Sequence, residues 1–146
     1  MMKRMGWTLA IGIALMMAQS TAFLVHASEV NTSNRYQVAG ITNPKAFEAF
    51  FVKLQEAVKK NDQTEVAKQM RYPLRVNKDG KSLFIKDEKQ FLADYDQIIT
   101  EKVKEAFLHQ KVNDTFVNDQ GVMVGNGEMW LGQFLDRFAV FAINVD

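Results

Sequence analysis

The hydrophobic pattern of this chain changes from mainly helical spacing to strand-forming segments at about Asp114, and that change sets the fold class. Over most of residues 43–110 the apolar side chains recur at the spacing of amphipathic helices, as at Phe47, Phe51 and Leu54. From Asp114 onward the chain is instead rich in β-forming residues that are separated by polar turn segments. We therefore expect an α+β fold in which N-terminal helices pack on a curved antiparallel β-sheet.

A helical hairpin is predicted at the start of this domain. In Thr42-Asn43-Pro44 a capping residue precedes proline at the first position of a helix, which extends to about Val58. A shorter second helix over Gln63–Met70 has Asp62 and Glu65 in the spacing of a capping box. The two helices are expected to pack against each other.

A β-hairpin and two more helices are expected next. The segments Tyr72–Val76 and Ser82–Lys86 flank a glycine-containing turn at residues 77–80, which predicts the hairpin. Asp87 then begins a third helix at a position where a carboxylate is favourable. Thr100 begins a short fourth helix, unless the chain only kinks there.

The C-terminal third predicts an antiparallel meander with strands near residues 115–117, 122–131 and 138–145. Gly125-Asn126-Gly127 allows either a hairpin turn or a bulge in one long, bent strand. Asn118–Gly121 already supplies a turn a few residues earlier, and a second turn would leave strands too short to build a sheet. We therefore expect the bent strand.

The N-terminus predicts export from the cytoplasm. Lys3 and Arg4 precede an apolar run at Trp7–Ala18, and Val25-His26-Ala27 offers small residues for cleavage. A membrane anchor is the alternative, but this run is shorter than the roughly 20 apolar residues of a spanning helix. We expect a signal peptide over residues 1–27 and a periplasmic or secreted product.

Cleavage after Ala27 would leave 119 of the 146 residues, which is the length of one domain. Ser20-Thr21-Ala22 is a second acceptable cleavage site. We expect a polar leader over residues 28–42 that is either mobile or loosely docked, with the core beginning after Gly40. A single α+β domain is expected over residues 43–146.

The composition argues against several functions. Loss of Lys3 and Arg4 lowers the basic residues from 18 to 16, against 17 acidic residues, so nucleic-acid binding is not expected. The chain has no cysteine for a disulfide, a lipid anchor or a thiolate metal site. After cleavage His109 is the only histidine, and no serine stands in G-x-S-x-G. We expect no catalytic residue, no metal site and no cofactor.

The order of these elements resembles that of the NTF2-like superfamily, also called SnoaL-like or cystatin-like cones. The resemblance covers roughly residues 43–146 and rests on element order together with Arg71–Val76 and Gly121–Trp130, segments that also look like those of small exported bacterial proteins. It implies a cone with a pocket between the concave face of the sheet and the helices. Enzymes of the superfamily use an Asp or His base beside tyrosine or other donors, and no such motif matches here residue by residue.

The candidate ligand site in this pocket consists of Tyr72, Tyr95, Glu128 and Trp130. Strand alternation puts Arg75 on the opposite face from Tyr72. The same alternation puts Glu128 and Trp130 on one side, unless a glycine bulge shifts the phase. Trp130 could then stack on a ligand while Glu128 accepts a hydrogen bond, or the pair could simply close the rim of the core.

Three other polar residues have structural explanations. Asp94 and Asp96 flank Tyr95 on adjacent helix positions that point apart, so both carboxylates are expected to be solvated. His109 stands near the end of the fourth helix, where an imidazolium is favourable.

These patterns predict an exported, soluble binding or accessory protein of the bacterial cell envelope. Its partner would be an unknown protein or small ligand, with no nucleic acid and no stable membrane anchor after cleavage. The alternative is a small-molecule enzyme of the isomerase or cyclase type that uses a cone pocket. Self-association into a homodimer through an exposed sheet face is a third hypothesis.

Overall fold

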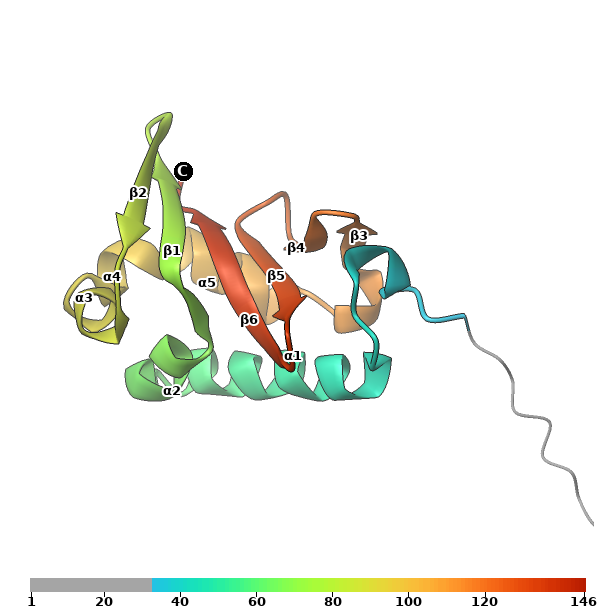
Figure 1. Cartoon of the computed structure of the whole chain (residues 1–146). Coiled ribbons are helices and arrows are strands. Elements are labelled where there is room, and N and C mark those ends of the chain that lie inside the picture. Colours follow the sequence, from blue (N-terminus) through green and yellow to red (C-terminus); the bar gives the residue numbers. More distant parts are fainter. Residues whose placement is uncertain (1–32) are drawn as a thin grey trace, which may run out of the picture. The chain divides into compact units, whose positions relative to one another are not determined.

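The apolar faces predicted from the sequence meet between a set of helices and one face of a β-sheet (Figure 1). The computed structural model describes residues 33–146. The predicted signal peptide and the first residues of the predicted leader lie outside the described residues. Within residues 33–146 no helix combines the length and the apolar character needed to cross a bilayer.

The described helices begin with a 3-10 turn, η1, and end with another, η2. Their bounds are η1 Gln37–Ala39, α1 Pro44–Lys59, α2 Gln63–Lys68, α3 Glu88–Ala93, α4 Tyr95–Ile98, α5 Glu101–His109 and η2 Val112–Asp114. The strands are β1 Met70–Lys78, β2 Lys81–Ile85, β3 Phe116–Asn118, β4 Gly121–Val124, β5 Met129–Phe134 and β6 Arg137–Asn144. The α+β class is therefore confirmed for this part of the chain.

Side-chain caps set the starts of the helices. Asn43 accepts a hydrogen bond from the Ala46 N–H at 3.0 Å, and Asp87 caps α3 in the same way. Thr100 has extended backbone and accepts from the Val103 N–H at 3.4 Å, so it begins a new helix and does not mark a kink. The predicted third helix is instead divided at Asp94, whose backbone leaves the helical conformation between α3 and α4.

The sheet of residues 33–146 has six strands in the order β2-β1-β6-β5-β4-β3. The predicted β1–β2 hairpin and the β3 to β6 meander are both present and antiparallel. The expectation of an antiparallel sheet throughout is wrong, because β1 and β6 pair in parallel where hairpin and meander join. The described sheet is therefore mixed.

The predicted bent strand at Gly125-Asn126-Gly127 is also wrong. Residues 125–128 form a turn between β4 and β5, in which Val124 pairs with Met129. Gly125 and Gly127 have φ of 57° and 116°, and the Gly127 N–H donates to the Val124 carbonyl at 3.0 Å. A short β4 is sufficient because it pairs with a strand on each side.

The core begins earlier than Gly40, within the segment predicted to dock loosely. Tyr36 and Ile41 are fully buried, and the Tyr36 ring packs against Phe47 with centroids 5.0 Å apart. Arg35 anchors the same segment by donating to the Thr115 carbonyl at 2.5 Å. The start of the described chain is thus part of the domain's packing.

Candidate functional site

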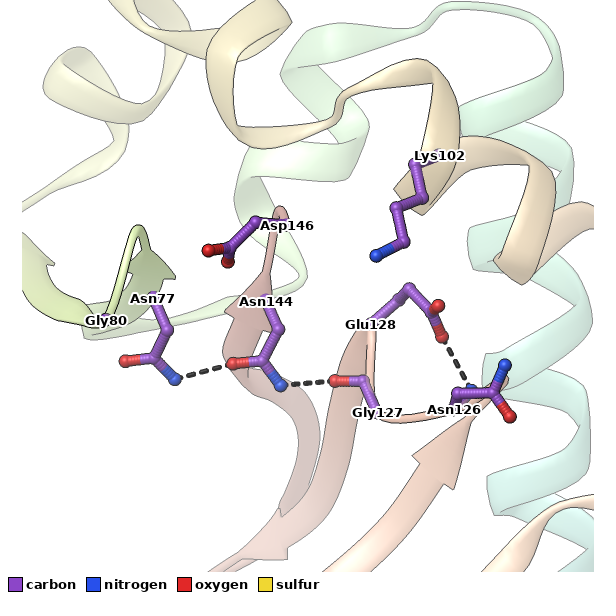
Figure 2. Close-up of a pocket in the computed structure, with 8 residues that line it drawn as sticks. All are labelled: Asn77, Gly80, Lys102, Asn126, Gly127, Glu128, Asn144 and Asp146. Carbon is purple, nitrogen blue, oxygen red and sulfur yellow. Dashed lines mark hydrogen bonds between the residues drawn. The ribbon is translucent and has the colours of Figure 1, made fainter.

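A polar cavity of about 570 Å³ lies where the ends of β1 and β6 meet the β4–β5 turn and the start of α5 (Figure 2). Because β1 and β6 are parallel, both strands end at this edge of the sheet. The residues that line the polar cavity are Asn77, Gly80, Lys102, Asn126, Gly127, Glu128, Asn144 and Asp146. Its volume falls within the range of small-molecule sites.

A chain of side-chain hydrogen bonds fixes one wall of the polar cavity. Asn77 and Asn144 are partners in the β1–β6 register, and the Asn77 Nδ2 donates to the Asn144 Oδ1 at 2.6 Å. The Asn144 Nδ2 in turn donates to the Gly127 carbonyl, and the Ser82 hydroxyl donates to the Asn77 Oδ1 at 2.6 Å. These amides hold one another in place, so the wall is set before any ligand binds.

Glu128 is held by the β4–β5 turn. Its side chain is 8% exposed, and Glu128 and Thr115 are the buried polar residues of the described chain. The carboxylate accepts the Asn126 N–H at 2.6 Å (Figure 2). A Cβ on Gly125 would collide with the Glu128 Oε2 and would lie 3.2 Å from the Ala106 Cβ. Glycine at position 125 therefore makes room for the buried carboxylate.

Charges of both signs face the polar cavity. Figure 2 shows the Lys102 amine, from the first turn of α5, directed toward the space between Asp146 and Glu128. Asp146 accepts the Asp79 N–H at 2.6 Å through one oxygen. The ion pairs found among residues 33–146 join Lys53 to Glu65 and Lys104 to Glu101 and do not involve Lys102. The polar cavity thus carries one cation and two carboxylates.

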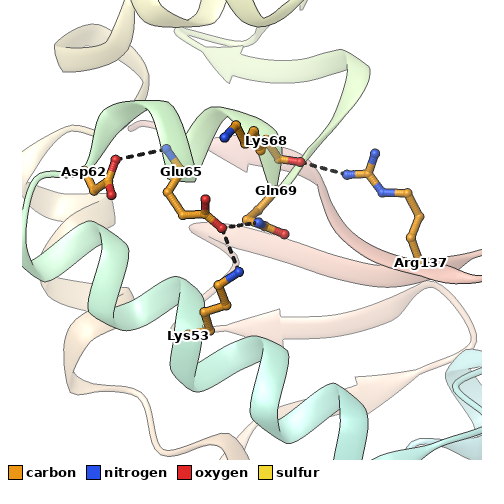
Figure 3. Close-up of polar contacts among 6 residues, drawn as sticks. All are labelled: Lys53, Asp62, Glu65, Lys68, Gln69 and Arg137. Atoms are coloured by element: carbon orange, nitrogen blue, oxygen red, sulfur yellow. Dashed lines mark hydrogen bonds and ion pairs between the residues drawn. The ribbon is translucent and has the colours of Figure 1, made fainter.

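A second polar cluster, around Glu65, holds α1 and α2 together (Figure 3). Glu65 Oε1 contacts Lys53 Nζ at 2.9 Å and accepts from the Gln69 side chain at 2.8 Å. Its partner in the predicted capping box, Asp62, accepts the Glu65 N–H at 3.1 Å, which is one half of the box. The Asp62 N–H donates instead to the Ala57 carbonyl. We interpret this cluster as structural.

The four predicted site residues do not share one pocket. Glu128 lines the polar cavity, Trp130 lines a separate cavity of about 190 Å³, and Tyr72 lines a third of about 650 Å³. Tyr95 is 2% exposed and belongs to the core. Glu128 belongs to the turn that precedes β5, so strand alternation does not relate it to Trp130.

Tyr72 and Tyr95 both pack edge-to-face against the buried Phe91 ring, with centroids 6.4 Å and 5.7 Å from it. The Tyr72 hydroxyl donates to the Ala67 carbonyl at 2.8 Å, whereas the buried Tyr95 hydroxyl has no hydrogen-bond partner within residues 33–146. Burial raises the pKa of Tyr95 to about 12, with a smaller contribution from Asp96. Burial also raises the pKa of Tyr72.

Asn77, Asn144 and Lys102 line the polar cavity but were not predicted as site residues from the sequence. The two asparagines become neighbours only through the parallel β1–β6 pairing, which local sequence patterns do not predict. Lys102 could have been noted because it stands in the first turn of a predicted helix, where a cation is unfavourable.

Of the two aspartates expected to be solvated, one is open to solvent and the other is partly covered. Asp96 is exposed and Asp94 is half-buried. His109 ends α5, and its Nδ1 lies 2.9 Å from the Glu105 carbonyl oxygen. In the described part of the chain, no group of three or more histidine or acidic side chains is arranged to hold a metal ion.

Comparison with known proteins gave no match: no protein-family model, no curated protein and no solved structure matches this chain. The resemblance to the NTF2-like superfamily therefore stays a prediction.

Gly125→Ala should destabilise the domain through Glu128. Gly80→Ala is the control, because Gly80 also has positive φ, 69°, but a Cβ there would have no neighbour within 4 Å. We expect Gly80→Ala to lower the free energy of unfolding by about 1 kcal/mol through backbone strain alone, and Gly125→Ala to lower it further. Glu128→Ala is then combined with each glycine variant, and urea unfolding gives the free energy of each. We expect a coupling energy of about 1 kcal/mol between positions 125 and 128, and none between positions 80 and 128. Equal effects of the two glycine substitutions would contradict this account.

Tyr95→Phe should change the stability of the domain at high pH. The folded-state pKa of Tyr95, about 12, lies above the ordinary value of 10.0. The folded state therefore favours the neutral hydroxyl, and its contribution to the free energy of unfolding is fully present below pH 10. As the pH rises from 10 to 12, the free energy of unfolding should fall by roughly 2 kcal/mol. Tyr95→Phe should reduce this loss and raise the free energy of unfolding at pH 7 by about 1 kcal/mol, because an unpartnered hydroxyl is removed.

Urea unfolding at pH 7 and across pH 9–12 measures both effects. Burial also raises the pKa of Tyr36 and of Tyr72, so part of the alkaline loss should remain in the variant. Tyr72→Phe is the matched control and should lower stability at pH 7, because it removes the bond to Ala67. If the free energy of unfolding of Tyr95→Phe falls between pH 9 and 12 as much as that of the parent chain, the Tyr95 hydroxyl is not buried as described.

Proposed function

We propose that this chain is an exported binding protein of the bacterial cell envelope and that its polar cavity binds a small zwitterion, such as a free amino acid or a short peptide. The observation that carries this proposal is the arrangement of Lys102, Asp146 and Glu128 around a cavity with a preformed amide wall. Export is supported by the signal-peptide pattern at residues 1–27.

The charges of the polar cavity suit a ligand that carries charges of both signs. Two carboxylates face one lysine, so an ammonium group is favoured near Glu128 and Asp146, and a carboxylate is favoured near Lys102. The Asn77 and Asn144 side chains bond mainly to each other and to the backbone, so their contribution is to hold the wall rigid. Glycine at positions 80 and 127 leaves the backbone open to a ligand.

The same proposal includes membership of the NTF2-like superfamily and its cone-shaped sheet. Two observations support it: the strand order β2-β1-β6-β5-β4-β3 and a core formed between the helices and a single face of the sheet. The predicted single domain also belongs to the proposal, with its core extended into the predicted leader because Tyr36 and Ile41 are buried.

The alternative function is a small-molecule enzyme of the isomerase or cyclase type. The observation that favours it is the burial of Glu128 beside the polar cavity, because a carboxylate with little solvent contact is suited to act as a base. We favour binding, because the Glu128 carboxylate is already engaged by the turn that it stabilises.

Calorimetric titration with amino acids and dipeptides tests the proposed function. We expect at least one of these amino acids or dipeptides to bind. Lys102→Ala should weaken its affinity about tenfold, because a charge-assisted hydrogen bond to the ligand is lost. An analogue of that ligand without its carboxylate should bind Lys102→Ala and the parent chain equally well.

Lys89→Ala is the control, because Lys89 is exposed on α3 and does not line the polar cavity. It should bind as the parent chain does. If no member of the panel binds, or if the two lysine variants behave alike, the proposed function is wrong.

A further inference from the structure

The face of the sheet opposite the helices, called the open face below, carries a continuous row of side chains with one residue from each strand. In the sheet registers Arg75 is the partner of both Phe84 and Ala142, and Trp130 is the partner of both Ala142 and Met123. Directly paired residues point to the same face of a sheet. In strand order this aromatic row reads Phe84, Arg75, Ala142, Trp130, Met123 and Phe116.

Burial places the aromatic row on the side away from the helices. Leu74 and Val76, the neighbours of Arg75 along β1, belong to the helix-facing core, as does Leu131 beside Trp130. The two ends of the row are open to solvent, because Phe84 is 58% exposed and Phe116 is 54% exposed. Six strands spaced about 4.8 Å apart extend the row over about 24 Å.

A second row, of hydrogen-bonding groups, runs beside the first. It consists of Ser82, Asn77 and Asn144, which are linked by the bonds described above. A shallow cavity of about 190 Å³ includes members of both rows. Its lining residues are Arg75, Asn77, Gln120, Trp130, Phe141, Ala142 and Asn144.

The aromatic content of this shallow cavity comes from two strands. Phe141 follows Val140, and the register with β5 shifts at this point, which brings Phe141 onto the open face beside Trp130. Ala142 is small and 1% exposed, so it forms the floor between Arg75 and the indole. The result is a shallow pocket lined by two aromatic rings and by the amides of Asn77, Gln120 and Asn144.

We propose that the open face binds an oligosaccharide chain. Trp130 is the stacking platform, and sugar hydroxyls bond to the Gln120 amide and to the second N–H of the Asn77 and Asn144 amides, whose first N–H holds the wall. A sugar ring has an apolar face and a rim of hydroxyls, which matches aromatic rings placed beside fixed amides. Arg75 is the one charged residue among those that line the shallow cavity, so a sugar that bears a carboxylate is preferred.

A second copy of the chain fits this face less well. Two aromatic rows packed face to face would bury Arg75 against a surface whose row contains no carboxylate. A buried guanidinium without an acceptor is costly, whereas a glycan supplies hydroxyl or carboxylate oxygens. The two proposals can be tested separately, because Lys102, Glu128 and Asp146 do not line the shallow cavity; Asn77 and Asn144 line both cavities.

Titration with two hexasaccharides, uncharged cellohexaose and anionic hexagalacturonate, tests this inference. Calorimetry gives the affinity, and amide and indole NMR signals locate the binding. We expect both sugars to shift the Trp130 indole signal, and hexagalacturonate to bind more tightly at low salt. Trp130→Ala should weaken both sugars about tenfold, and Trp130→Phe should restore part of the affinity. Arg75→Gln should weaken hexagalacturonate alone.

Two controls separate this face from the rest of the molecule. Lys102→Ala alters only the polar cavity, and Leu135→Ala alters an apolar residue that is 95% exposed in the β5–β6 turn; both should leave sugar affinity unchanged. The inference would be overturned if the folded parent chain bound neither sugar, or if Trp130→Ala bound the sugars as tightly as the parent chain does. A dimer that dissociates in Trp130→Ala, without sugar binding, would overturn it in favour of a second copy.

Discussion

The parallel pairing of β1 with β6 is the interaction on which the rest of the domain depends. It joins the β1–β2 hairpin to the four-stranded meander, which otherwise have no shared strand. The Val140 N–H donates to the Gln69 carbonyl at 2.9 Å, and the Val145 N–H donates to the Asn77 carbonyl at 3.0 Å, so the contact extends from the middle of β6 to the residue that follows it. Between them the register shifts, within the segment that contains Pro73, which has no N–H to donate.

Both proposed sites are consequences of this pairing. It places Asn77 beside Asn144, and their hydrogen bond separates the polar cavity from the shallow cavity of the open face, because both residues line both cavities. It also places Arg75 beside Ala142 and so completes the aromatic row across the sheet. Loss of the pairing would therefore remove two binding surfaces together, although each is tested by residues that belong to it alone.

Local patterns were sufficient to predict the elements that depend on local interactions. The caps at Asn43, Asp87 and Thr100 and the turn before β2 follow from side-chain hydrogen bonds and glycine conformation within a few residues. The parallel pair could not be predicted in this way, because its partners are about 70 residues apart in the chain. The turn at Gly125 was misinterpreted because strand length was judged without the neighbours that support β4.

The candidate site residues also divide into those that local sequence patterns predicted and those that only the tertiary fold brings together. Glu128 was predicted as a fixed hydrogen-bond acceptor in a pocket and does line a cavity, but its lysine and asparagine neighbours there come from α5, β1 and β6. Trp130 was identified as a stacking residue and grouped with Glu128 by alternation, a rule that does not extend into the turn. Tyr95 was expected in a pocket and lies in the core, where tertiary packing decides its position.

Native-state hydrogen exchange at Val140 tests the central role of the β1–β6 pair most directly. Its amide bonds across the parallel pair to Gln69, so it can exchange only when the two strands separate. If the pair holds the domain together, the Val140 amide should exchange with the free energy of global unfolding, as should buried amides in the middle of α1. Exchange of Val140 at a clearly lower free energy, while amides between β5 and β6 remain protected, would show that the hairpin separates from the meander and would contradict this account.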